Sequence, residues 1–158
     1  MEDRNKEAIE KQLQSNNIDW DAVVKVSTTH YVFPALYCNI QRANLLDYLP
    51  QELVTYMEHI TKLNRERNEE IITQAKELNI LLLANNITPI FLKGTGNLLA
   101  GIYDDIAERM VGDIDFIFSK DDYSKAIKVL REFGYSEVEK YKYHFPEHKH
   151  YRRLQKEN

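Results

Sequence analysis

One stretch of the sequence, residues 91–118, constrains the fold more than any other. It places a glycine-rich turn, Lys93-Gly94-Thr95-Gly96, directly after a short apolar segment, and then two aspartates, Asp113 and Asp115, within a second apolar segment. Residues i and i+2 of a β-strand point to the same face, so we expect the two carboxylates to project side by side. Paired carboxylates favour a shared hard cation, here Mg²⁺ or Mn²⁺. An Asp-x-Asp pair standing alone is also typical of a solvated acidic turn.

The glycine-rich turn predicts an anion site. It ends an expected strand and opens an expected helix, and the free N–H groups at a helix N-terminus bind phosphate oxygens. Gly94 lets the backbone approach closely, while Thr95 adds a hydroxyl and Lys93 a positive charge. The turn lacks the full P-loop and dinucleotide-binding patterns, and its alternative interpretation is a plain strand-to-helix turn. Turn and acid pair together indicate a ligand that carries phosphates and a metal, with a nucleoside triphosphate as the leading candidate.

Arg109 lies shortly before the acid pair. Its guanidinium offers a fork of donors that suits phosphate oxygens, which makes it, with Lys93, a candidate nucleotide-binding residue. The alternative for Arg109 is a surface ion pair with one of three acidic neighbours, Asp104, Asp105 or Glu108.

Length and composition limit the class of protein. The chain has 158 residues, 43% of them hydrophobic and 29% charged, which fits one globular domain or a small domain with a helical extension. Its net charge of -4 offers no overall basic field for nucleic acid or an anionic membrane, and no apolar run approaches the roughly 20 residues of a membrane span. Cys38 is the single cysteine, so no disulfide forms within the chain. We expect a cytoplasmic protein with no membrane partner.

Residues 1–86 are expected to form a helical N-terminal region. Asn17 or Asp19 can cap one helix, and Pro34 suits the first turn of the next. A longer helix is expected to start at Leu49-Pro50-Gln51-Glu52 and to stop at Asn85-Asn86. It carries one apolar stripe at helical spacing, formed by Ile71, Ala75, Leu78 and Leu82.

Residues 87–158 are expected to form an α/β core. The expected elements are a strand over Ile87–Leu92, a helix over Thr95–Ile102, a strand over Val111–Phe118, a helix from Ser119 to Gly134 and a strand over Tyr135–Tyr143. A hairpin return through His148-Lys149-His150-Tyr151 would complete the last strand pair. The predicted class is therefore α+β, with a small mixed β-sheet.

Four segments carry a family resemblance. They are Phe91-Leu92-Lys93-Gly94, Leu98-Leu99-Ala100 with Tyr103 and Arg109, Gly112-Asp113-Ile114-Asp115-Phe116-Ile117, and Phe133-Gly134-Tyr135. In this order they resemble the uncharacterised nucleotidyltransferases, bacterial proteins of the polymerase-β-like superfamily. A helical lead-in with Asp19-Trp20 and His30-Tyr31-Val32-Phe33-Pro34 is similar to the same group and extends the likeness from Trp20 to His150.

The resemblance implies a nucleotidyltransferase core. Such a core uses Mg²⁺ or Mn²⁺ to transfer a nucleoside monophosphate from a nucleoside triphosphate to a hydroxyl of an acceptor. The acceptor is unknown and is a small molecule, a protein or RNA. Gly94 and Thr95 stand where the superfamily has its Gly-Ser turn, and Asp113 and Asp115 match its metal-binding, catalytic acid pair.

One departure from the superfamily concerns its third carboxylate, which a later strand normally supplies. The acidic candidates in the corresponding region are Glu137, Glu139 and Glu147, and none has the family's sequence context. We expect the chain to be a truncated form of a longer protein. The alternative is a catalytically impaired, antitoxin-like module that binds or regulates a partner. A metal-dependent glycosyltransferase is a third interpretation.

The remaining reactive side chains are assigned more ordinary roles. His144, His148 and His150 lie close together in the sequence, and a metal site there is conceivable. A polar strand near the site is the favoured interpretation. Cys38 is expected to be an inert core thiol.

Overall fold

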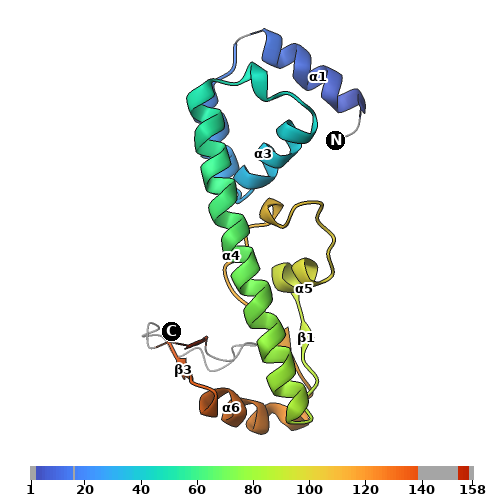
Figure 1. Ribbon diagram of the computed structural model, residues 1–158, viewed down its shortest axis with the longest axis vertical. Helices are drawn as coiled ribbons and strands as arrows, with labels where there is room; N and C mark the ends of the chain where they lie inside the picture. The colour runs from blue at the N-terminus through green and yellow to red at the C-terminus, as the bar shows by residue number, and fades with distance from the viewer. Residues whose placement is uncertain (1–2, 16, 139–152, 157–158) are drawn as a thin grey trace. The chain divides into compact units, whose positions relative to one another are not determined.

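The computed structural model describes residues 3–15, 17–138 and 153–156 (Figure 1). Its α-helices are α1 (Asp3–Gln14), α2 (Trp20–Thr29), α3 (Phe33–Arg42), α4 (Gln51–Ala84), α5 (Lys93–Leu99) and α6 (Tyr123–Glu132). Short 3₁₀ turns are η1 (Leu46–Tyr48), η2 (Ile106–Glu108) and η3 (Lys120–Asp122), and the strands are β1 (Ile90–Phe91), β2 (Phe116–Ile117), β3 (Tyr135–Glu137) and β4 (Leu154–Lys156). The predicted α+β class is confirmed.

Contacts divide the chain into two compact units. The first comprises Met1–Glu77 and Ile90–Phe116, and the second comprises Leu78–Pro89 and Ile117–Asn158. Helix α4 contributes residues to both units. The predicted division near residue 86, into a helical region and an α/β core, stays a prediction.

The helices at the start of the first unit begin where local signals predict. Asp19 caps α2, since its Oδ1 accepts a hydrogen bond from the N–H of Ala22 at 2.9 Å. Pro34 lies in the first turn of α3, where a missing N–H costs no hydrogen bond. Tyr31 and Asn44, with φ of 58° and 57°, take left-handed conformations in the turns that follow α2 and α3.

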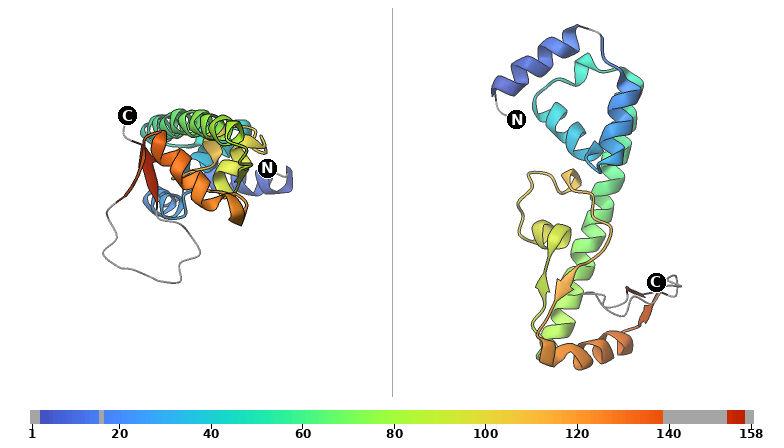
Figure 2. Two further views of the ribbon diagram at one scale, coloured as in Figure 1. Left: turned by 90° about the horizontal axis from the view of Figure 1, so that it is seen from below. Right: turned by 180° about the vertical axis from the view of Figure 1, so that it is seen from behind.

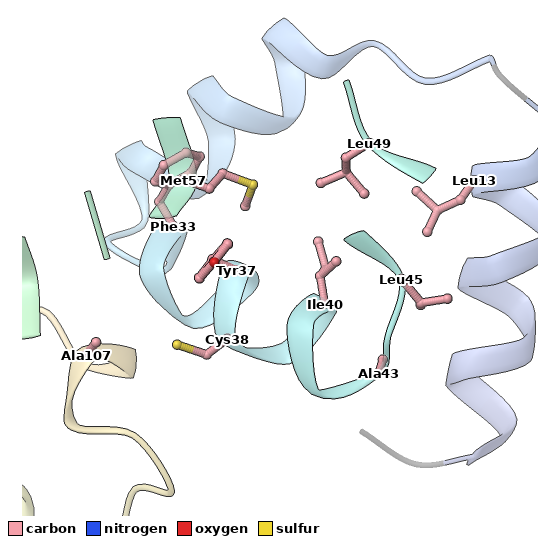
Figure 3. Packing of buried hydrophobic residues seen from close by; sticks show 10 residues of the cluster. All are labelled: Leu13, Phe33, Tyr37, Cys38, Ile40, Ala43, Leu45, Leu49, Met57 and Ala107. Atoms are coloured by element: carbon pink, nitrogen blue, oxygen red, sulfur yellow. The ribbon is translucent and has the colours of Figure 1, made fainter. Parts of the chain in front are cut away.

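A hydrophobic cluster holds the helices of the first unit together (Figure 3). Its buried members are Leu13, Phe33, Tyr37, Cys38, Ile40, Ala43, Leu45, Leu49, Met57 and Ala107. Leu13 comes from α1, Met57 from α4 and Ala107 from η2. Because η2 takes part, the cluster also packs the helices against the segment that leads toward Asp113.

Helix α4 spans 34 residues. The predicted apolar stripe is confirmed, because its four members are at most 8% exposed: Ile71, Ala75, Leu78 and Leu82. The helix stops as predicted at Asn85-Asn86. Asn86 is left-handed with φ of 54°, and the N–H of Ile87 donates to the carbonyl of Leu82 at 2.9 Å. Charged residues interrupt α4, and the described part of the chain has no helix that is both long and apolar enough to cross a membrane.

Strand pairing beside the glycine-rich turn is shorter than predicted. β1 and β2 form a two-stranded sheet (Figure 2) of two residues each, against the expected runs Ile87–Leu92 and Val111–Phe118. Pro89 has no N–H to donate, which limits pairing before β1. One further bond, from the N–H of Leu92 to the carbonyl of Asp115 at 2.8 Å, continues the contact beyond the two strands. Helix α5 then begins at Lys93, earlier than predicted, and ends at Leu99.

The second unit contains α6 and the sheet of β3 and β4. Ser119 caps the turn before α6, and Gly134 follows the helix with φ of 96°, a conformation that favours glycine. β3 and β4 are antiparallel, with the register Tyr135–Lys156, Ser136–Gln155 and Glu137–Leu154. The described strands thus form two separate two-stranded sheets and not one mixed sheet, since β1 pairs with β2 and β3 with β4. The predicted return through residues 148–151 lies outside the described residues.

Candidate functional site

Two hydrogen bonds join the glycine-rich turn to the acidic segment within the first unit. The N–H of Leu92 donates to the carbonyl of Asp115 at 2.8 Å. The hydroxyl of Thr95 donates to the carbonyl of Asp113 at 3.0 Å. Because both aspartates are tied by their backbone to the turn, the structure brings together the two features that the sequence predicts to share one site.

The two glycines of the turn permit close packing. A Cβ at Gly96 would lie 2.7 Å from the carbonyl oxygen of Phe91, and a Cβ at Gly94 would lie 2.8 Å from Cγ2 of Val111. Real Cβ atoms essentially never show such distances. The left-handed residue of the turn is instead Lys93, with φ of 50°. Gly94 and Gly96 therefore let α5 lie directly against the strand before it and the segment that precedes the acid pair.

Lys93 already faces one of the aspartates. Its Nζ lies 3.1 Å from Oδ1 of Asp115, with the lysine side chain 62% exposed and the aspartate side chain 27% exposed. A largely solvated pair of this kind contributes little to stability. The pair matters electrostatically, because the ammonium of Lys93 lies beside the Asp115 carboxylate, which would otherwise attract another cation.

The acid pair itself consists of one exposed and one half-buried carboxylate. Asp113 lies at a bend before β2 and is exposed, whereas Asp115 immediately precedes β2. The described residues contain no group of three or more His, Cys, Asp or Glu side chains that would enclose a metal. Two carboxylates are nevertheless a sufficient protein contribution for Mg²⁺, which keeps several waters and binds substrate phosphates. That the two side chains share one face stays a prediction.

The sequence model of a protein family described as uncharacterised nucleotidyltransferase matches residues 16–157. The chain belongs to this family. Comparisons with curated proteins and with solved structures find no match. The family match covers the helices from α2 onward as well as the turn and the acid pair, so membership in the nucleotidyltransferase family includes the helical lead-in.

Thr95 is a buried residue of the turn, and its hydroxyl contacts the acidic segment. Its side chain is 1% exposed and its hydroxyl proton is used on the carbonyl of Asp113. A hydroxyl so placed positions the acidic segment. Direct phosphate contact by Thr95 stays a prediction.

Arg109 is exposed, and its acidic neighbours pair with other residues. Among the described ion pairs, Arg42 binds Asp104 at 2.6 Å and Glu108 at 2.7 Å. Arg65 binds Asp105 at 2.6 Å. Among the described residues these three acidic neighbours therefore form their ion pairs with Arg42 and Arg65 and not with Arg109, and phosphate contact by Arg109 stays a prediction.

Sequence reasoning missed two asparagines of α4 that hold the segment before the acid pair. Nδ2 of Asn64 donates to the carbonyls of Ala107 at 2.7 Å and Arg109 at 3.1 Å. Nδ2 of Asn68 donates to the carbonyls of Ile106 at 2.6 Å and Arg109 at 2.7 Å. A signal was present, because the apolar stripe of α4 continues at helical spacing through Asn68, Asn64 and Thr61, where polar residues stand at buried positions.

Asp105 anchors the start of the same segment. Its two oxygens accept from Nε and Nη2 of Arg65 at 3.1 and 2.6 Å, and its Oδ1 also accepts from the N–H of Ala107 at 2.8 Å. The hydrogen bond from Arg65 is the main reason that the pKa of Asp105 lies below its ordinary value. The same bond raises the pKa of the Arg65 guanidinium.

The other candidate residues lie away from the turn or outside the described chain. Cys38 is a free, buried thiol, and burial, reinforced by Asp105 and Glu108, raises its pKa to about 11. This environment agrees with the predicted inert core thiol. Glu137 binds Arg131 at 2.6 Å. Residues outside the described ranges include the remaining candidates, Glu139, His144, Glu147, His148 and His150.

Proposed function

We propose that this nucleotidyltransferase-family protein transfers a nucleoside monophosphate from a nucleoside triphosphate to a hydroxyl group of an acceptor. The observation that carries the proposal is the Thr95–Asp113 hydrogen bond of 3.0 Å. It joins a turn suited to phosphates to the backbone carbonyl of Asp113, whose side-chain carboxylate is suited to a metal, in a chain whose family match spans residues 16–157.

Asp113 and Asp115 are the residues proposed to hold Mg²⁺ or Mn²⁺. The donor set fits, because two carboxylates with solvent access leave coordination positions for water and phosphate oxygens. When bound, the metal would neutralise charge on the triphosphate and favour attack by the acceptor oxygen. The ammonium of Lys93, 3.1 Å from Oδ1 of Asp115, would offset charge on a phosphate oxygen beside this carboxylate.

The protein's own residues position and neutralise the substrate in this proposal. The acceptor oxygen forms a bond to the α-phosphorus while the bond from that phosphorus to the leaving pyrophosphate oxygen breaks. The acceptor proton passes to a base that the described residues do not assign. Lys93 and Arg109 offset charge on the phosphates, and Gly94 keeps α5 close to the acidic segment.

A binding module without transfer is the second candidate function. It is favoured by the composition of the site, because the described residues place two carboxylates there and no group of three. An antitoxin-like or regulatory role would need the nucleotide site for recognition alone. Release of pyrophosphate with any acceptor hydroxyl decides against it, and a preference for sugar nucleotides would instead favour the glycosyltransferase interpretation.

The decisive experiment is calorimetric titration of nucleoside triphosphates with and without Mg²⁺. We expect binding that depends on the metal and that is lost in the double variant Asp113→Ala with Asp115→Ala. The matched control is Asp47→Ala, which removes an exposed aspartate in η1, and it should bind as the unaltered protein does. Binding that is indifferent to Mg²⁺ and to both aspartates would refute the proposal.

The cytoplasmic location is likewise a proposal. It rests on the single cysteine, Cys38, which is buried and unpaired with another cysteine.

A further inference from the structure

The polar face of α4 that meets residues 105–109 is unusually well buried for its chemistry. Asn64 is 6% exposed, Asn68 is 0% exposed and Thr61 is 1% exposed. They follow one another at the i, i+3 and i+4 spacings that place side chains on one helix face. Each such burial costs free energy unless hydrogen bonds replace those to water.

The two asparagines replace them with carbonyls of one short segment. η2 has few internal hydrogen bonds of its own, as a single 3₁₀ turn must. The amide groups of Asn64 and Asn68 together donate four hydrogen bonds to carbonyls of η2 and of Arg109 directly after it, of 2.7, 3.1, 2.6 and 2.7 Å. Two of the four go to the carbonyl of Arg109, which both asparagines therefore hold from the same side.

The side-chain oxygen of Asn68 indicates which part of the buried amide forms contacts. Within the described part of the chain Oδ1 of Asn68 has no hydrogen-bond partner, although the residue is fully buried. An apolar residue would avoid the cost of that oxygen. The amide of Asn68 contributes through its donors alone, and these fix the backbone at Ile106 and Arg109.

From Arg109 the constraint passes along a short path to the acid pair. Val111 is 7% exposed and lies against the position where a Cβ of Gly94 would stand. Asp113 lies two residues further along the chain, and its backbone carbonyl accepts a hydrogen bond from the hydroxyl of Thr95. The backbone between Arg109 and Asp113 is thus fastened at one end by α4 and at the other by α5.

We propose that Asn68 and Asn64 are positioning residues that set the Arg109 and Asp113 end of the nucleotide site. This inference rests on the proposed function, which it extends by assigning part of the site's geometry to the N-terminal helical region. It follows that α4 is a working part of the site in addition to a structural support.

The test compares triphosphate affinity with stability in four variants. Asn68→Leu keeps the size of the side chain but removes both donors, and Asn64→Leu removes the pair with the longer bond to Arg109. We expect the dissociation constant for the Mg²⁺–triphosphate complex to rise about tenfold in Asn68→Leu and less in Asn64→Leu. Thr61→Val removes a buried hydroxyl that has no hydrogen-bond partner among the described residues, and it should leave affinity unchanged.

A stability-matched variant separates positioning from general damage. Leu45→Ala opens a cavity in the hydrophobic cluster, where Leu45 is 1% exposed, and should lower the free energy of unfolding while affinity stays unchanged. Calorimetry is done under conditions in which urea titration shows each variant to be folded. If Asn68→Leu does not fold, the affinity of Asn64→Leu tests the inference.

Equal affinity in the unaltered protein and a folded asparagine variant overturns the positioning inference alone. An equal loss in Leu45→Ala overturns it as well. If the unaltered protein binds no triphosphate, the proposed function fails, and the same variants are compared by their affinity for Mn²⁺. The inference is then also overturned if the asparagine variants bind Mn²⁺ as tightly as the unaltered protein does, or if neither the variants nor the unaltered protein bind Mn²⁺.

Discussion

Replacing Gly96 by alanine tests whether the glycines of the turn are required by packing. Gly96 lies in α5, and an added Cβ would stand 2.7 Å from the carbonyl oxygen and 3.1 Å from the carbonyl carbon of Phe91. An ordinary carbon–oxygen contact is about 3.3 Å or longer. The neighbour is backbone of β1, next to the Leu92–Asp115 hydrogen bond, so it cannot turn aside as a flexible side chain would.

Two opposing terms set the size of the effect. Within a helix, alanine is favoured over glycine by about 1 kcal/mol. Forcing an extra carbon into a packed site costs typically about 1–3 kcal/mol, and a backbone neighbour places Gly96→Ala toward the upper end. The expected net loss is about 2 kcal/mol of unfolding free energy, or a fall in Tm of about 4–8 °C for a chain of this length.

Urea unfolding and calorimetry measure this loss, and a second glycine supplies the control. A Cβ at Gly112 would meet no atom within 4 Å, and its φ is not left-handed, so Gly112→Ala should be neutral or stabilising by up to about 1 kcal/mol. If Gly96→Ala is as stable as the unaltered protein, or as stable as Gly112→Ala, the close approach of α5 to β1 is refuted.

Three further outcomes are expected. Lys93→Met removes the ammonium 3.1 Å from Asp115, so the affinity for Mn²⁺ alone, measured by calorimetry, should rise about two- to fivefold, in keeping with the small energy of an exposed pair. A fall in Mn²⁺ affinity would contradict competition between Lys93 and the metal. Because the pKa of Asp105 is lowered, its contribution to stability is complete above the usual value of 3.8 and is lost as the pH falls through that value toward the lowered one. The unfolding free energy of Asp105→Asn should therefore lie below that of the unaltered protein at pH 7, and the gap should narrow as the pH falls below 3.8. A gap that does not narrow in acid would count against the Arg65 contact. Burial raises the pKa of Cys38 from 9.0 to about 11. At pH 8 a thiol reagent should therefore label the folded protein at least about 100-fold more slowly than the urea-unfolded chain. Comparable labelling rates would show that the thiol is accessible.

The helical region shows how far local patterns reach. Asp19 caps α2, Pro34 opens α3 and Asn86 closes α4, each as expected from chemistry within a few residues of chain. The stripe of α4 is buried as predicted because helical spacing alone places those side chains on one face. Such features depend on short-range sterics and hydrogen bonds, which the sequence states directly.

The extent of the strands could not be read in the same way. The apolar runs around β1 and β2 predict longer strands than the two residues each that pair. Strand length depends on a partner elsewhere in the chain, and here the Leu92–Asp115 bond is followed directly by α5. Apolar character marks a segment for burial, whereas pairing decides how much of it becomes a strand.

For the site, the sequence by itself determined the residue types: a glycine-rich turn, a lysine and an arginine, and two aspartates in a family-like order. Tertiary structure decided their relations. In the folded chain Lys93 pairs with Asp115, and the hydroxyl of Thr95 donates to the carbonyl of Asp113. The carbonyl of Arg109 accepts hydrogen bonds from Asn64 and Asn68. The last contact joins residues more than forty positions apart in the chain. A buried amide needs partners that only folding can bring to it, which is why the sequence places Asn64 and Asn68 on the stripe of α4 but does not reveal the carbonyls of residues 106–109 that they bind.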